Sequence, residues 1–153
     1  MNRRQLYKLT SLIPNKIYRK NLIDKYQSRY LNERFSYHIH YLNIMTERLD
    51  FRNKVVLDAG GSNIPRDYMI NYLGVKKFIS IDYISEYWKN SKTYHNFINK
   101  NIYNAKEAIE AFEKEDCFVI DDMLSNIPEY FYGKFDIIIS IDAFEHIFNL
   151  REC

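Results

Sequence analysis

Residues 54–63 read KVVLDAGGSN, a short apolar run that ends in an acid and passes directly into a glycine pair. An apolar run of this length is typical of a buried strand. Gly60 and Gly61 allow the backbone to bend sharply and to approach a ligand without a Cβ in the way. Pro65 suits the first turn of a helix, and we expect that helix to end at Gly74. These residues therefore predict a strand, a tight turn and a helix.

Strand-like runs recur along the rest of the chain, with helical patterns between them. The later runs are KFISI at 77–81, CFVI at 117–120 and FDIIISI at 135–141. Trp88 is expected on a short helix, and one apolar stripe at helical spacing comprises Ile102, Ala105, Ala108, Ile109 and Phe112. Near-continuous apolar strands that alternate with helices predict a parallel sheet covered on both faces. The predicted fold class is α/β: a Rossmann-like parallel sheet with flanking helices, preceded by an N-terminal helical segment and incomplete, with strands 1–4 only.

Residues 1–53 read as helices, which Pro14 divides near the start. Within 33–50, five apolar residues recur at spacings of three and four: Phe35, Ile39, Leu42, Met45 and Leu49. This spacing predicts an amphipathic helix, which we expect to end near residues 50–53. We therefore expect a helical N-terminal extension over 1–53 and a partial Rossmann-like domain over 54–153.

The charges of the chain are unevenly distributed. The 153 residues carry a net charge of +2. Residues 1–54 hold 12 Lys or Arg against 4 Asp or Glu, a net +8, and the remainder holds 10 against 16, a net −6. A basic arm of this kind can meet nucleic acid, a phosphorylated substrate or an anionic membrane surface. It is equally consistent with a solvated helix face that balances the acidic body.

The two cysteines, Cys117 and Cys153, form no CxxC pair, and no Cys/His cluster has the spacing of a zinc site. We therefore expect no metal, and a reduced, cytoplasmic protein. No apolar stretch of signal-peptide length follows the basic start, and no run approaches the roughly 18 residues of a membrane span.

Acids follow the expected strands at the edge where ligands of parallel sheets bind. Asp82 ends the second strand, 22 residues after Gly60, which is the expected interval for an acid that accepts hydrogen bonds from ribose hydroxyls. Asp122 follows the third strand, where a carboxylate can accept from an exocyclic amine such as adenine N6.

Together these features resemble the class I S-adenosylmethionine-dependent methyltransferases, over roughly residues 54–150. The first motif of that family is approximately D/E-x-G-x-G-x-G. Asp58 and Gly60 match it, Gly61 is an additional glycine, and Ser62 and Ile64 take the places of the second and third family glycines.

Three later segments resemble the other motifs of the family. FISID at 78–82 resembles the second, whose acid holds the ribose. VIDDM at 119–123 resembles the third, whose acid contacts adenine N6 and whose next backbone amide contacts the ring. FDIIIS at 135–140, followed by FEHI at 144–147, resembles the fourth.

The resemblance implies S-adenosylmethionine as the cofactor and methyl transfer as the activity. The cofactor-binding residues that it implies are Asp58, Gly60, Gly61, Ser62, Asp82, Tyr83, Asp122, Met123 and Ser140. His146 is the candidate catalytic residue, because its ordinary pKa suits a general base near neutral pH.

Each of these residues also has a purely structural interpretation. Asp58 can cap the turn, Asp121 and Asp122 can be solvated loop acids, and Asp142 can cap the last helix. Glu145 and His146 can be an exposed pair, and Trp88 can serve packing instead of shielding an adenine. At the level of function, the alternatives are an inactive or truncated methyltransferase-like binding module and an NAD(P)-binding Rossmann oxidoreductase, although the G-x-G-x-x-G spacing is missing.

The run 135–141 is apolar on both faces, as in a central strand. If the family order holds, it pairs with the first strand and expects a further strand on its other side. Because no further strand-like run follows before Cys153, we expect either a fragment of a longer product or self-association through 135–141, with poor solubility. The methyl acceptor stays open: a small molecule or sugar is favoured slightly, and the basic arm allows a nucleic acid.

Overall fold

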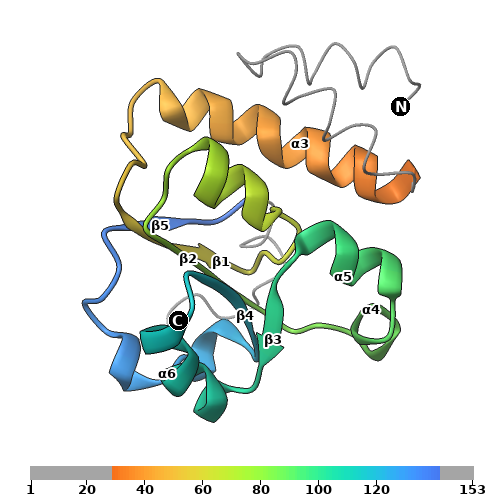
Figure 1. Ribbon diagram of the computed structural model, residues 1–153, viewed down its shortest axis with the longest axis vertical. Helices are drawn as coiled ribbons and strands as arrows, with labels where there is room; N and C mark the ends of the chain where they lie inside the picture. Colours follow the sequence, from red (N-terminus) through yellow and green to blue (C-terminus); the bar gives the residue numbers. More distant parts are fainter. Residues whose placement is uncertain (1–28, 142–153) are drawn as a thin grey trace.

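The computed structural model describes residues 29–141 and contains a parallel five-stranded sheet with helices on both faces (Figure 1). The order across the sheet is β3-β4-β2-β1-β5. The strands are β1 (Val55–Ala59), β2 (Lys77–Asp82), β3 (Asn101–Tyr103), β4 (Cys117–Asp121) and β5 (Ile137–Ile139). The α/β, Rossmann-like fold class is thereby confirmed, and β5 lies beside β1 as expected.

Within the described residues, one helix precedes β1, and the others lie in the connections between the strands. They are α3 (Arg29–Thr46), the π-helical η1 (Asp67–Tyr72), α4 (Glu86–Lys89), α5 (Lys92–Ile98), α6 (Ala105–Lys114), and the 3₁₀ turns η2 (Leu124–Asn126) and η3 (Glu129–Phe131). Trp88 lies on the short helix α4, as expected, and Gly74, with φ 70°, follows the end of η1. None of the helices within 29–141 is long and apolar enough to cross a membrane.

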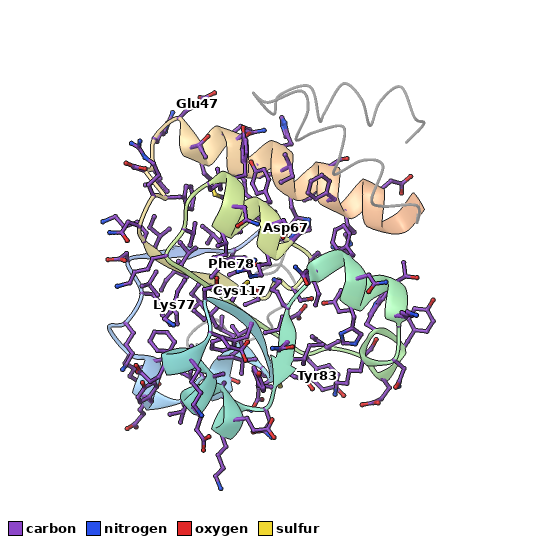
Figure 2. The ribbon with its side chains drawn as sticks, in the orientation of Figure 1. Glu47, Asp67, Lys77, Phe78, Tyr83 and Cys117 are labelled. Atoms are coloured by element: carbon purple, nitrogen blue, oxygen red, sulfur yellow. The ribbon has the colours of Figure 1, made fainter. Side chains whose placement is uncertain are left out.

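Two hydrophobic cores cover the two faces of the sheet. The α3 core lies against α3, η1 and α5, and it contains Phe35, Ile39, Tyr68, Phe97, Val56, Phe78 and Val119. The α6 core lies on the opposite face, and it contains Ala108, Phe112, Phe131, Leu57, Ile79, Phe118 and Ile120. Figure 2 shows Phe78 and Cys117 in the interior. Because side chains alternate along a strand, Asp58, Ser80 and Asp82 point to the same face as Val56 and Phe78.

The sheet has one strand that the sequence did not predict. Ile102 was expected on the helical stripe that continues to Phe112, and this expectation was wrong: Ile102 lies in β3, which pairs with β4. The helix starts later because Asn104 caps it. The Asn104 side chain accepts from the amides of Lys106 and Glu107, while the Glu107 carboxylate accepts from the Asn104 amide.

Two element ends also differ from expectation. Helix α3 ends at Thr46 instead of near 50–53, and Leu49 is exposed, because the chain turns there to bury Phe51. The run 135–141 pairs with β1 only over Ile137–Ile139. The expectations for Pro14, and for everything from Asp142 onward, lie outside the described residues.

Candidate functional site

The carboxyl ends of β1, β2, β4 and β5 form one edge of the sheet. The register places Ala59 opposite Ile81 and Asp82 opposite Asp121, while Ile139 pairs with Asp58. The predicted site residues that follow these strands therefore come together in space, as expected for a ligand edge.

The two positions after β1 require glycine for different structural reasons. Gly60 has φ 75°, which glycine adopts without strain, and its amide donates to the Ile81 carbonyl at 2.8 Å. A Cβ on Gly61 would lie 2.5 Å from Oδ2 of Asp58. The turn therefore passes directly over the Asp58 carboxyl group, and a larger residue at 61 would have to displace that group.

Ser62 stands where the family motif has its second glycine, and its side chain has a definite role. Ser62 is buried, and its hydroxyl donates to Oδ2 of Asp82 at 2.9 Å. This bond ties the glycine turn to the end of β2. The serine thus links two of the predicted site residues.

Asp58 is fully buried beneath the turn. Burial raises the pKa of its carboxyl group to about 7, and the charge of nearby Asp82 adds to the rise, while Lys100 and the hydroxyl of Ser80 oppose it. Ser80 donates to Oδ2 over a long 3.5 Å. Oδ1 has no hydrogen-bond partner among the described residues.

Asp82 is partly exposed at the same edge. Burial raises the pKa of its carboxyl group, and hydrogen bonds from the Ser62 hydroxyl and the Tyr83 amide oppose the rise. Tyr83 itself is 72% exposed, so its ring is available to a ligand at this edge.

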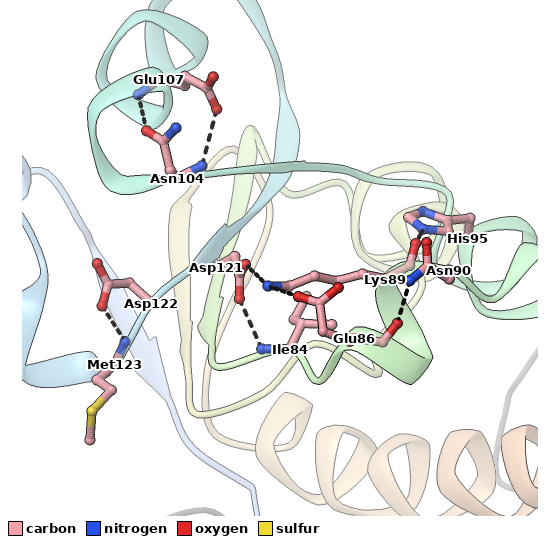
Figure 3. Close-up of polar contacts among 10 residues, drawn as sticks. All are labelled: Ile84, Glu86, Lys89, Asn90, His95, Asn104, Glu107, Asp121, Asp122 and Met123. Atoms are coloured by element: carbon pink, nitrogen blue, oxygen red, sulfur yellow. Dashed lines mark hydrogen bonds and ion pairs between the residues drawn. The ribbon is translucent and has the colours of Figure 1, made fainter.

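The two acids at the carboxyl end of β4 have local partners (Figure 3). Asp121 accepts from the Ile84 amide at 3.0 Å and pairs with the Lys89 ammonium at 2.6 Å, which anchors α4 to the end of β4. Asp122 accepts from the Met123 amide at 2.7 Å and from the Asn126 side chain at 2.9 Å. Asp122 thus stabilises the η2 turn.

The remaining predicted residues are Met123, Ser140, Trp88 and His146. The Met123 side chain is 61% exposed beside Asp122. The Ser140 hydroxyl, after β5, is buried and has no hydrogen-bond partner within the described part of the chain. Trp88 packs between the rings of Tyr87 and Tyr94. His146 lies outside the described residues.

Lys100 belongs to this site and was missed by the sequence analysis. It is only 6% exposed, and its ammonium donates to the Ser80 hydroxyl at 2.9 Å. A single lysine within the polar segment 99–101 carries no motif, and lysines are rarely buried. Nothing in the sequence therefore singled it out.

Comparison with known proteins found no matching family model, no significantly similar curated protein and no significantly similar solved structure. The chemistry of the edge is therefore the basis for any functional interpretation. It offers carboxylate acceptors, a glycine turn and an exposed tyrosine. No cluster of three or more metal-binding side chains occurs in residues 29–141.

Proposed function

We propose that this chain binds S-adenosylmethionine at the carboxyl edge of its sheet and takes part in methyl transfer. The observation that carries the proposal is the place of Asp82, which ends β2 directly beside the glycine turn and is bonded to Ser62 of that turn at 2.9 Å. An acid at this interval after the glycines is suited to accept hydrogen bonds from ribose hydroxyls.

The residues around Asp82 fit such a ligand. Gly60 brings backbone close to the edge without a side chain, and Tyr83 offers an exposed aromatic ring. Two buried polar atoms at the same edge, Oδ1 of Asp58 and the Ser140 hydroxyl, have no partner within 29–141. A polar ligand at this edge would supply partners for both atoms.

When bound, the cofactor supplies a methyl group on a sulfonium, which a nucleophile on the acceptor takes. The role of this chain is to hold the two reactants in line, which accounts for much of the rate in such transfers. In this proposal Asp82 and the glycine turn orient the cofactor. His146 serves as the base if the acceptor must lose a proton.

The proposal is tested by calorimetric titration with S-adenosylhomocysteine. We expect binding by the unaltered chain and about 10-fold weaker binding by Asp82→Asn, because a hydrogen bond to a charged acceptor contributes about 1.5 kcal/mol or more. The asparagine keeps an acceptor for Ser62, so the turn stays tied. Asp50→Asn is the matched control, since Asp50 is an exposed acid bonded to Arg52 beyond α3.

The same titration with NAD separates methyl transfer from the dinucleotide alternative, because both ligands offer a ribose to Asp82. Tighter binding of NAD than of S-adenosylhomocysteine, or absence of heat and of a thermal shift with S-adenosylhomocysteine, would overturn the proposal. For the acceptor, we propose a small molecule or sugar, and a nucleic acid bound by the basic residues of 1–54 is the alternative to assay beside it.

A further inference from the structure

Lys100 is a buried cation that the proposed function does not use. It follows α5, which Asn99 caps in the left-handed conformation with φ 50°. This turn directs the chain back toward the sheet, and the Lys100 ammonium lies 4.6 Å from the centre of the Phe78 ring. Lys100 therefore lies in the α3 core, on the face to which Asp58 and Ser80 point.

The Lys100 ammonium is joined to Asp58 through one hydroxyl. It donates to the Ser80 Oγ at 2.9 Å, and that oxygen lies 3.5 Å from Oδ2 of Asp58. An ammonium can only donate, so Ser80 accepts from Lys100 and its own proton is directed to the carboxylate. When Asp58 is ionised, the polarity of this three-residue chain is fixed, and the chain ends beneath the glycine turn.

We propose that Lys100 is a positioning residue for the glycine turn, holding the Asp58 carboxylate beneath Gly61 through the Ser80 hydroxyl. The space above the carboxylate is small, since a Cβ on Gly61 would lie 2.5 Å from Oδ2 of Asp58. The Asp58 carboxyl group therefore lies directly against Gly61. The inference rests on the proposed function only where it concerns the effect of Lys100 on ligand binding.

The titratable groups near this chain of contacts come from β2, β4 and α3. Asp82 on β2 faces Asp58 and Lys100, Cys117 on β4 faces Lys100, and Arg34 on α3 faces Asp82. Burial lowers the pKa of the Lys100 ammonium, and Cys117, Asp58 and Asp82 raise it. Lys100 in turn lowers the pKa of Asp58 against the effect of burial.

The test is the titration of Asp58 in the ligand-free full chain, followed by carboxyl carbon NMR. Lys100→Met removes the cation and keeps much of the side-chain volume, so the Asp58 midpoint should rise by about 1 pH unit or more. Ser80→Ala removes the hydroxyl bridge with little loss of packing and should raise the same midpoint. An unchanged midpoint in both variants would overturn the proposal.

Lys77→Met is the matched control. Lys77 begins β2 at the opposite edge, where its ammonium donates to the carbonyls of Phe112 and Glu115 at the end of α6. Its loss should lower the melting temperature and leave the Asp58 midpoint unchanged. An equal rise of the midpoint in this control would show a general effect of unpacking and would contradict the specific role of Lys100.

Lys100→Met leaves a buried carboxylate without its cation and can fail to fold. In that case Lys100→Met combined with Asp58→Asn should recover a cooperative melt, because no unpaired charge is then buried. If the double variant also fails to fold, Asp58 is not the partner of Lys100 and the proposal is wrong.

Calorimetry with S-adenosylhomocysteine completes the test. Lys100→Met should weaken binding about 10-fold, and Lys77→Met should not weaken it. If the unaltered chain does not bind this ligand, the proposed function fails, while the Asp58 titration still decides the role of Lys100. If binding survives in Lys100→Met with a raised Asp58 midpoint, the turn does not depend on Asp58 and the positioning role is refuted.

Discussion

Asp58 is an acid with no exposure to solvent, and this determines how it responds to pH. In the unfolded chain its carboxyl group has a pKa of 3.8, and burial raises this pKa to about 7 in the folded state. Between these values the folded state binds the extra proton. The contribution of Asp58 to the free energy of unfolding is therefore fully present below pH 3.8 and is lost as the pH rises through about 7.

Asp58→Asn should remove this dependence. We expect the free energy of unfolding of the unaltered chain, measured against the variant, to fall between pH 4 and pH 8 by up to about 4 kcal/mol. Urea unfolding of both proteins at several pH values measures the difference. A difference that stays constant over this range would contradict the buried, proton-holding state of Asp58.

The turn after β1 is the element in which the backbone and the buried acid constrain each other. Gly60 supplies a positive φ, and Gly61 lies against the Asp58 carboxyl group. Ser62 then ties the turn to Asp82 at the end of β2. The turn is thus held at both ends by side chains of the candidate site.

Gly61→Ala should destabilise the chain by about 2 kcal/mol or more, because the new methyl group displaces Asp58 or the turn. Gly133→Ala is the control: position 133 has a positive φ but open space around a Cβ, so only the backbone strain of about 1 kcal/mol applies. Thermal melts compare the two. A Gly61→Ala variant as stable as the unaltered chain would show that the turn is not confined by Asp58.

The strands differ in how well their sequences predict them. β1, β2 and β4 are central, and their continuous apolar runs were sufficient to identify them. β3 is a three-residue edge strand, and its Asn101 and Tyr103 do not form an apolar run. It exists because β4 provides a partner for its backbone, which no local pattern reveals.

At the scale of the whole molecule, the two cores give the two faces of the sheet different roles. The α6 core is made of apolar residues throughout. The face of the α3 core carries the buried polar residues Asp58, Ser80 and Lys100 among its apolar ones. Polar groups are costly to bury, so their concentration on one face, directly below the glycine turn, favours a site at that place.

The candidate site was predictable where it follows strand ends and unpredictable where it depends on tertiary structure. Asp82 and the glycine pair stand at intervals that parallel sheets impose, so the sequence was sufficient to bring them together. Lys100 reaches the same place through the left-handed turn at Asn99 and the packing of α5. That path depends on the folded chain as a whole.

Binding at the carboxyl edge is the central claim, and chemical-shift mapping tests it most directly. Amide NMR spectra of the full chain are recorded with and without S-adenosylhomocysteine. The account predicts the largest shifts at the amides of Gly60, Gly61 and Tyr83. The absence of shifts under saturating ligand, or shifts confined to the opposite edge around Asp116 and Asp136, would contradict it.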